Sequence, residues 1–538
     1  MIGPVKGVNM SSDLQNQPSR SGPPELWLND APLRSAAAKA GAAPSHLATY
    51  AAALGQEEWA GAARAANRHP PELRLFDRGG RRLDQVEFHP AYHGFLRLGL
   101  GAGYAALPWQ QPGGHATHAA MVYLHSQVEP STCCPMTMTY AAYPALQANP
   151  ALAALWSPRL LAWAYDPSDQ PASEKVGATI GMAMTEKQGG SDVRANITRA
   201  EAQGETYSLT GHKWFCSAPM SDAFLTLAQA PGGLTCFLAP RWRADGSRNA
   251  IHLMRLKDKL GNRANASAEI EYHGAEATRI GDEGQGVRAI LEMVHHTRLD
   301  TAVAPAGLMR AALAEATWWA QGRAAFGHRL IDQPLMRAVL ADLSLDWQGA
   351  LALAMRVAQA FDGQTPESRA FARIAVALAK FINNKRCPVV ITECMEILGG
   401  MGYVEDTPLP LLYREAPLNG IWEGCGNVIC LDILRSLRRD PLAGPTLIQE
   451  LGAAKGNDSA YDQALRDHVA RWPTPPDEAE ARWFAERTAL LLTASILLQS
   501  GSPAAEPFIA TRLAGQRGHV TGSISKLNTA ALIDSILA

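Results

Sequence analysis

The sequence predicts an α+β, mainly α protein with a helical N-terminal domain, an antiparallel β middle domain, a C-terminal helical bundle and an extra helical module. Three observations predict this. Alanine and leucine recur at helical spacing on both sides of a middle segment whose short runs favour strands. The helical stretches after that segment are long enough to imply a bundle. A stretch rich in proline, Pro441-Leu-Ala-Gly-Pro445, then separates the last module.

Length and charge limit the classes of function. A chain of 538 residues is too long for one core, so several domains are expected. Lys and Arg number 49 against 51 Asp and Glu, so the whole molecule has no bulk attraction for nucleic acid or acidic lipid. No leader pattern and no apolar run of about 18 residues is present. The eight cysteines form no Cys-x-x-Cys pair, which favours reduced thiols. We expect a cytoplasmic protein without membrane contact.

The N-terminal part divides into two segments. Residues 1–25 are rich in Pro, Ser, Gly and Asn, which predicts a mobile or partner-clasping arm. Residues 26–176 are predicted to form the helical domain, with loops at Pro70-Pro71 and at Asp77-Arg-Gly-Gly80. His115 and His118 have the spacing of helical metal ligands, but no third ligand is in register, so we expect surface histidines and no metal site. The small-residue segment 127–139 either lines a pocket or packs in the core.

The remaining domains follow in order. Residues 177–281 are predicted to form the β-domain, with turns at Gly211 and at Pro231-Gly-Gly233. Residues 282–440 are predicted to form the bundle, because helical periodicity extends over 304–325, 336–361 and 369–398. Residues 441–538 are predicted to form the extra helical module.

Two stretches carry chemistry. Gly181-Met-Ala-Met-Thr-Glu-Lys-Gln-Gly-Gly-Ser-Asp-Val193 is dense in hydroxyls and adjacent glycines, which let backbone amides approach a polar ligand. In Tyr413-Arg-Glu415 and Ile421-Trp-Glu-Gly-Cys-Gly-Asn427, the carboxylate Glu423 lies between an aromatic residue and glycine. That setting desolvates an acid and leaves room for substrate. Cys425 has no histidine near it in sequence, which argues against a nucleophile.

These paired motifs, across a strand-rich middle and a helical C-terminal half, resemble the acyl-CoA dehydrogenase family. The stretch Thr185-Glu-Lys-Gln-Gly-Gly-Ser-Asp192 and the extra module resemble its AidB branch, the alkylation-response flavoproteins. The resemblance covers essentially the whole chain and implies an FAD cofactor and an acyl-CoA substrate. A cofactor is required because no side chain accepts a hydride, and the chain has no Gly-x-Gly-x-x-Gly between a strand and a helix.

By this resemblance, Glu423 is the catalytic base. We expect it to take the α-proton of an isovaleryl-CoA-like thioester while the flavin takes the β-hydride, with its pKa raised by burial against Trp422. The alternative is a carboxylate that only hydrogen-bonds the flavin turn. The implied flavin-binding residues are Met182, Met184, Thr185, Gly190, Ser191, Trp214, Phe215, Cys216, Ser217, Arg323, Phe326, Gly399, Gly400, Ile421, Trp422, Gly424, Asn427 and Leu431.

Two of these segments match family signatures. Arg323-Ala-Ala-Phe326-Gly327 resembles the segment that reaches the FAD of a neighbouring subunit, which implies a homotetramer. Glu396-Ile-Leu-Gly399-Gly400-Met-Gly-Tyr403 resembles a cofactor-contacting turn, with Glu396 where relatives usually have Gln, so the contact at that position stays open. For Trp214 the alternative to flavin contact is a core aromatic.

The AidB resemblance also implies binding of double-stranded DNA and its protection during alkylation stress. Beyond residue 440, eight basic residues face ten acidic ones, a poor composition for phosphate contact. A basic patch of Arg435, Arg438 and Arg439 with Arg512 and Arg517 is one interpretation, and a solvated helix face is the other. Two functions compete with this hypothesis: an ordinary catabolic dehydrogenase for short or branched acyl-CoA, and a non-catalytic, flavin-stabilised DNA-binding scaffold.

Overall fold

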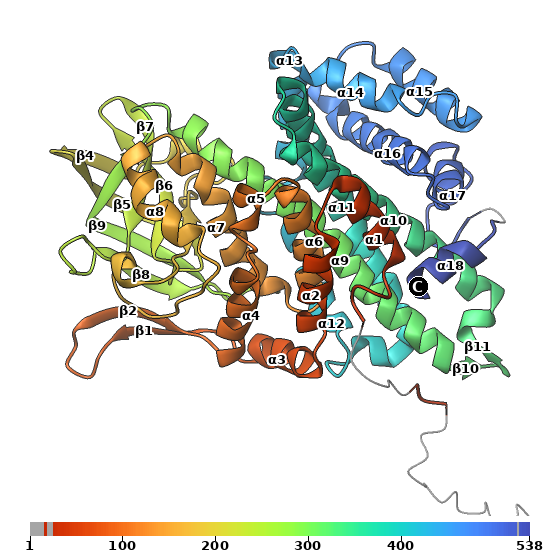
Figure 1. Ribbon diagram of the computed structural model, residues 1–538, viewed down its shortest axis with the longest axis horizontal. Helices are drawn as coiled ribbons and strands as arrows, with labels where there is room; N and C mark the ends of the chain where they lie inside the picture. Colours follow the sequence, from red (N-terminus) through yellow and green to blue (C-terminus); the bar gives the residue numbers. More distant parts are fainter. Residues whose placement is uncertain (1–15, 19–24, 525–526, 538) are drawn as a thin grey trace, which may run out of the picture.

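The computed structural model describes residues 16–18, 25–524 and 527–537. Most of the predicted arm, residues 1–25, therefore lies outside the described residues. The sheet lies on one side of a central group of helices, and α14–α18 lie on the opposite side (Figure 1). This order of helices, sheet and helices agrees with the predicted fold class. Within the described residues, no helix has both the length and the apolar character needed to cross a bilayer.

The N-terminal region is helical but also contains a hairpin that the sequence analysis missed. Strands β1 (Glu72–Phe76) and β2 (Arg82–Glu87) pair antiparallel. The Asp77 side chain accepts hydrogen bonds from the backbone of Gly79 and Arg81, which closes the turn. The helices of this region are α1 (Ala31–Ala40), α2 (Pro44–Leu54), α3 (Glu57–Arg68), α4 (Pro90–Gly101), α5 (Leu107–Gln110), α6 (Gly114–Ser126), α7 (Cys133–Leu146) and α8 (Pro150–Leu160).

The middle region is a mixed sheet, which corrects the prediction of a purely antiparallel one. Strand β3 pairs parallel with β6, because the chain reaches β6 through β4 and β5 and not through a hairpin. Strand β6 also pairs with both β4 and β7, so the order β6-β4-β5-β9-β7 closes into a ring. The strands are β3 (Ile180–Ala183), β4 (Arg199–Gln203), β5 (Thr206–Ser217), β6 (Ala223–Ala230), β7 (Gly233–Pro240), β8 (Ile251–Leu256) and β9 (Ser267–Ile280).

Three long helices form the bundle, and the first of them reaches back onto the sheet. Helix α9 begins at Gly286, inside the segment 282–440 that was predicted to be helical. A Cβ atom at that glycine would come within 2.5 Å of the Thr235 backbone, so the residue permits the close approach of helix and sheet. The elements are α9 (Gly286–Gly322), β10 (Ala324–Ala325), β11 (His328–Arg329), α10 (Pro334–Asp362), α11 (Pro366–Leu398), α12 (Leu409–Glu415) and α13 (Gly426–Arg439).

The C-terminal module is joined to the bundle by buried ion pairs. Arg512, with a side chain only 5% exposed, lies 2.6 Å from Asp342 and 2.9 Å from Asp346, both on α10. Arg386 on α11 shares Asp346, and Arg517 lies 3.4 Å from Asp342. The expected surface patch containing Arg512 and Arg517 is therefore wrong, because both guanidinium groups pair with interior carboxylates. The helices are α14 (Ala443–Gly452), α15 (Ser459–Arg471), α16 (Ala481–Gln499), α17 (Ala505–Phe508) and α18 (Ala530–Leu537).

Candidate active site

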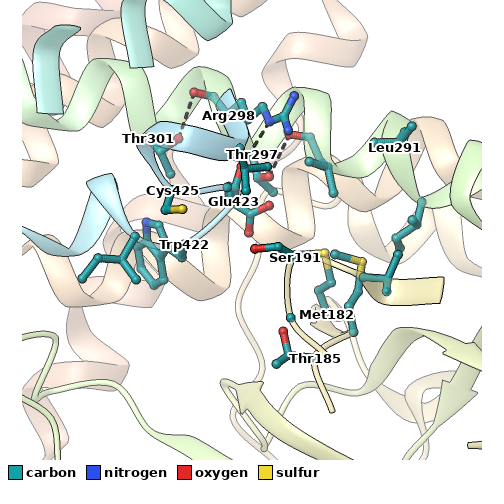
Figure 2. A pocket seen from close by; sticks show the side chains of 18 of the residues that line it. Met182, Thr185, Ser191, Leu291, Thr297, Arg298, Thr301, Trp422, Glu423 and Cys425 are labelled. Atoms are coloured by element: carbon teal, nitrogen blue, oxygen red, sulfur yellow. Dashed lines mark hydrogen bonds between the residues drawn. The ribbon is translucent and has the colours of Figure 1, made fainter. Parts of the chain in front are cut away.

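A cavity of about 1440 Å³ lies where the sheet, the first half of α9 and the turn before α13 meet. It exceeds the ~300–1,000 Å³ of an ordinary small-molecule pocket. Both sequence motifs contribute side chains to it, although they lie more than two hundred residues apart. Figure 2 shows Met182, Thr185 and Ser191 on one side and Trp422 with Glu423 facing them. The predicted residues that line it are Met182, Met184, Thr185, Gly190, Ser191, Phe215, Ser217, Ile421, Trp422, Glu423 and Gly424.

Glu423 lies in a turn that buried cations hold in place. Its φ is 59°, in the left-handed region that non-glycine residues rarely adopt. Arg298 of α9 donates from Nε to the Glu423 carbonyl at 3.1 Å (Figure 2). Lys380 of α11 donates from Nζ to the Gly424 carbonyl at 3.1 Å and to the Asn419 carbonyl at 2.7 Å. Strained backbone that the surrounding structure holds in this way is common at functional sites.

The electrostatic setting of Glu423 suits a general base. Burial raises the pKa of its carboxyl group, and the Thr297 hydroxyl with the charges of Lys380 and Arg298 opposes that rise. Its Oε2 atom is buried and has no hydrogen-bond partner among the described residues. Buried polar atoms are usually paired, so an unpartnered carboxylate oxygen beside a cavity is free to receive a proton.

A second carboxyl group, Glu415 at the end of α12, lines the same cavity. Burial raises its pKa to about 7. Its Oε2 accepts a hydrogen bond from the Asn262 backbone at 2.6 Å, and its Oε1 accepts one from Asn262 Nδ2 at 3.4 Å. Both oxygens are thus occupied by one neighbour.

Only two of the four predicted flavin-binding residues on strand β5 reach the cavity. Phe215 and Ser217 line the cavity. The Trp214 ring lies outside it, with Lys257 Nζ 3.4 Å from the ring centroid, and the Cys216 side chain is buried in the core of the sheet. The pairing of β5 with β9 is irregular between Lys213 and Cys216, so this run does not follow a simple alternation of faces.

Six other predicted residues also lie outside the cavity. Phe326 is 97% exposed, and Arg323 donates to the Asn16 carbonyl at 2.7 Å. Gly399 and Gly400 are exposed, and Asn427 accepts a hydrogen bond from Arg482 of α16. Leu431 is half-buried on α13. The cavity of one chain therefore does not contain these residues.

The arginines predicted to contact DNA fall into two groups on α13. Arg435 and Arg439 line the cavity, four residues apart and so on one face of the helix. Arg438 does not line it and donates to the Pro476 carbonyl at 2.8 Å.

The polar residues that position Glu423 were not predicted from the sequence, and two histidines lie elsewhere than predicted. Thr297, Arg298 and Lys380 lie within long helices, where a charged residue in a mostly apolar stretch was the available signal. His115 and His118 are buried, not surface residues: His118 Nε2 lies 2.7 Å from Asp300, and His115 Nδ1 lies 2.8 Å from the Tyr140 hydroxyl. The described residues contain no group of three or more metal-ligating side chains.

Comparison with known proteins identifies the family. The model of the adaptive response protein AidB N-terminal domain matches residues 16–167, and the acyl-CoA dehydrogenase middle and C-terminal domain models match 181–275 and 284–438. The Escherichia coli (strain K12) protein "Putative acyl-CoA dehydrogenase AidB" is 44% identical over 496 residues, which is 91% of this chain and 92% of that protein. The chain belongs to the acyl-CoA dehydrogenase family, in its AidB branch.

Solved structures confirm the acyl-CoA dehydrogenase fold. Caenorhabditis elegans ACDH-11, solved in complex with C11-CoA, matches with a TM-score of 0.83 and 27% identity, over 95% of this chain and 94% of that one. The apo-form of Bd2924 matches with a TM-score of 0.80 and 29% identity, over 90% of this chain and 99% of that one.

Membership of this family makes the protein an FAD-dependent acyl-CoA dehydrogenase, which confirms the predicted cofactor and enzyme class. The residues present fit such a cofactor. The hydroxyls of Thr185, Ser191 and Ser217 line the cavity and supply the donors that carbonyl and phosphate groups accept. Gly190 and Gly424 line it as well, and glycine lets a ligand approach the backbone closely.

Proposed function

We propose that Glu423 removes the α-proton of an acyl-CoA thioester bound in this cavity. The observation that carries the proposal is the buried, unpartnered Oε2 of Glu423 beside a cavity large enough for a cofactor and a substrate. FAD, when bound, supplies the hydride acceptor for the β-carbon. Arg298 and Lys380 fix the turn, and Thr297 limits the rise in the pKa of the carboxyl.

The flavin is held, in this proposal, by residues of two subunits. Thr185, Ser191 and Ser217 contact it from the chain that supplies Glu423. Arg323, Phe326, Gly399 and Gly400 contact the flavin of a neighbouring subunit in a homotetramer. The exposure of Phe326, Gly399 and Gly400 on one chain supports this assembly, because such residues are available to a partner.

The proposed substrate is an isovaleryl-CoA-like thioester, and the C11-CoA complex of ACDH-11 supports an acyl-CoA ligand. The test is the visible spectrum of the purified holoenzyme, recorded anaerobically before and after addition of isovaleryl-CoA. We expect the flavin band to bleach. Glu423→Gln should keep the flavin and reduce it ~10²–10⁴ times more slowly, because the general base is lost.

Two outcomes would contradict the proposal. If the flavin of Glu423→Gln bleaches as fast as that of the wild-type protein, the catalytic base is another residue. If no short or branched acyl-CoA bleaches the flavin of the wild-type protein, the non-catalytic, flavin-stabilised scaffold is favoured. Bleaching without any DNA binding would favour an ordinary catabolic dehydrogenase.

A second proposed role is DNA binding in the cytoplasm during the alkylation response. It is supported by the AidB branch, by the exposure of Arg435, Arg438 and Arg439, and by eight free cysteines, which suit a reducing compartment. Charge reversal at the three arginines should abolish binding of a DNA duplex and its salt dependence. Unchanged binding at every salt concentration would reject this patch.

A further inference from the structure

A second cavity, of about 460 Å³, lies along α10 and is large enough for a small ligand. Its lining residues on α10 recur at spacings of three and four, so they form one face of the helix and the floor of a groove. They are Gln348, Leu351, Ala352, Met355, Arg356 and Gln359. None of the described residues lines both this groove and the cavity of Glu423. We call it the α10 groove.

Apolar side chains cover the floor and both walls of the α10 groove. Leu351 and Met355 of the floor are buried. Helix α1 supplies one wall and α16, in the C-terminal module, supplies the other, with Pro32, Ala36, Ala40, Ile496 and Leu497. An alkyl chain gains free energy when it leaves water for such a surface. The groove therefore favours a ligand with an apolar body.

One end of the α10 groove carries a positive charge. Gln359 Nε2 donates to the Lys39 carbonyl at 3.1 Å, so Lys39 of α1 lies at the Gln359 end. The Lys39 ammonium donates to the Ser500 carbonyl, and among the described residues it has no carboxylate partner. Arg356 is already paired with Glu450, at 2.7 and 2.8 Å. The charge of Lys39 therefore remains for an anionic group of a ligand.

The length of the α10 groove fits a particular size of ligand. Gln348 and Gln359 lie at the two ends of the floor, about 16 Å apart along the helix. The Gln348 end is closed by a polar contact, because Gln348 Nε2 donates to Ser535 Oγ of α18 at 2.8 Å. An extended chain advances about 1.2 Å per bond, so about thirteen bonds span the groove. A fatty acid of about twelve carbons has this length.

We propose that the α10 groove binds a medium-chain fatty acid, with its carboxylate at Lys39 and its alkyl chain along Leu351 and Met355. This site is separate from the acyl-CoA site proposed above and does not depend on it. Because α1 and α16 form its walls, a bound fatty acid holds the N-terminal domain against the C-terminal module. A ligand that binds only the folded state stabilises that state.

The test is isothermal titration calorimetry of the flavin-loaded protein with saturated fatty acids. From octanoate to dodecanoate, affinity should rise by up to about fourfold for each added carbon, as each buried methylene leaves water. Tetradecanoate should bind no more tightly than dodecanoate, because the groove is filled. Saturating isovaleryl-CoA should not displace decanoate.

Variants separate the charge from the apolar surface. Lys39→Gln should bind decanoate about five- to tenfold more weakly, because a charge-assisted hydrogen bond is lost. Decan-1-ol has the same chain without the charge, so it should bind Lys39→Gln and the wild-type protein alike. Lys455→Gln removes an exposed lysine of the C-terminal module outside the groove and should bind both ligands normally. Ala352→Trp fills the groove and should bind neither.

Several outcomes would overturn the proposal. Equal decanoate binding by the wild-type protein and Lys39→Gln would reject the carboxylate contact, even if Ala352→Trp failed to fold. Equal losses for decanoate and decan-1-ol in Lys39→Gln would mean that Lys39 only stabilises the end of α1, since it lies in the last turn. Displacement by isovaleryl-CoA would place the fatty acid in the Glu423 cavity. Decanoate binding that weakens as the protein associates, with Ala352→Trp changing the oligomeric state, would assign the groove to contact between copies of this chain.

Discussion

Two carboxyl groups line the same cavity, and only one of them is equipped to act as a base. Glu415 is buried and Glu423 is half-buried, and desolvation raises the pKa of both carboxyl groups. Both oxygens of Glu415 accept hydrogen bonds from Asn262, whereas Oε2 of Glu423 has no hydrogen-bond partner among the described residues, and Glu423 is held through its backbone. Burial and a raised pKa are therefore not sufficient to identify a catalytic acid or base. The free oxygen distinguishes them.

The largest expected effect on stability comes from Arg298, one of the two cations that hold the Glu423 turn. Arg298→Met removes the buried partner of Asp432 and leaves this mostly buried carboxylate with the exposed Arg435 as its remaining cation. We expect the free energy of unfolding, measured by urea denaturation, to fall by ~3–5 kcal/mol. Arg435→Met removes a 56% exposed partner of the same Asp432 and should cost less than ~1 kcal/mol. Equal losses would show that Arg298 is not the main support.

Glu415 should affect the pH dependence of stability and not the rate of flavin reduction. Its pKa is about 7 in the folded chain against an ordinary 4.5, so between these values the folded state keeps a proton that the unfolded state has released. The stability that this group contributes is complete below pH 4.5 and is lost as the pH rises through about 7, a change of ~3 kcal/mol.

Glu415→Gln removes this titration. The difference in free energy of unfolding, variant minus wild type, should therefore increase by ~3 kcal/mol between about pH 4.5 and pH 8, as measured by denaturation at each pH. The same variant should reduce its flavin within about tenfold of the wild-type rate, unlike Glu423→Gln. A pH-independent difference, or a rate as low as that of Glu423→Gln, would remove the contrast between the two carboxyl groups.

The pH dependence of flavin reduction tests Glu423 itself. The base must be ionised, so the rate should rise with pH through a midpoint above the ordinary value of a glutamate. Lys380→Met removes a nearby positive charge that favours the carboxylate and should move this midpoint upward by up to about one unit. An unchanged midpoint would show that Lys380 acts on the turn by position alone.

The smallest expected effect concerns the partner of Glu415. Asn262 has a φ of 55°, a conformation that glycine adopts readily and alanine does not. Both Asn262→Ala and Asn262→Gly lose the three hydrogen bonds of the side chain but keep the backbone bond to Glu415. Thermal unfolding should show Asn262→Gly to be the more stable of the two by ~1 kcal/mol. The reverse order would mean that backbone strain at this position is negligible.

The sequence predicted the parts of the site that depend on local motifs. The hydroxyl- and glycine-rich stretch around Thr185 and the turn at Glu423 do meet in one cavity. The run from Trp214 to Ser217 was not resolved in this way, because the irregular pairing of β5 with β9 has no signature in the sequence. Resemblance alone treated that run as one unit.

The remaining features depend on contacts between distant segments. Arg298 and Lys380 become supports of the catalytic turn only when α9 and α11 lie beside it. The parallel pairing of the four-residue β3 with β6 has no local signature. The burial of His118 likewise depends on Asp300, 182 residues away.

The ion pairs of Arg512 change the meaning of the proline-marked boundary near residue 441. A protein ending there would leave Asp342 and Asp346 inside the bundle with Arg386 as their remaining neighbour. Unpaired buried carboxylates are costly enough to prevent folding of a marginally stable core. The linker therefore separates two segments of sequence but not two folding units, and a shortened gene product lacking the last hundred or so residues should be recovered as aggregate.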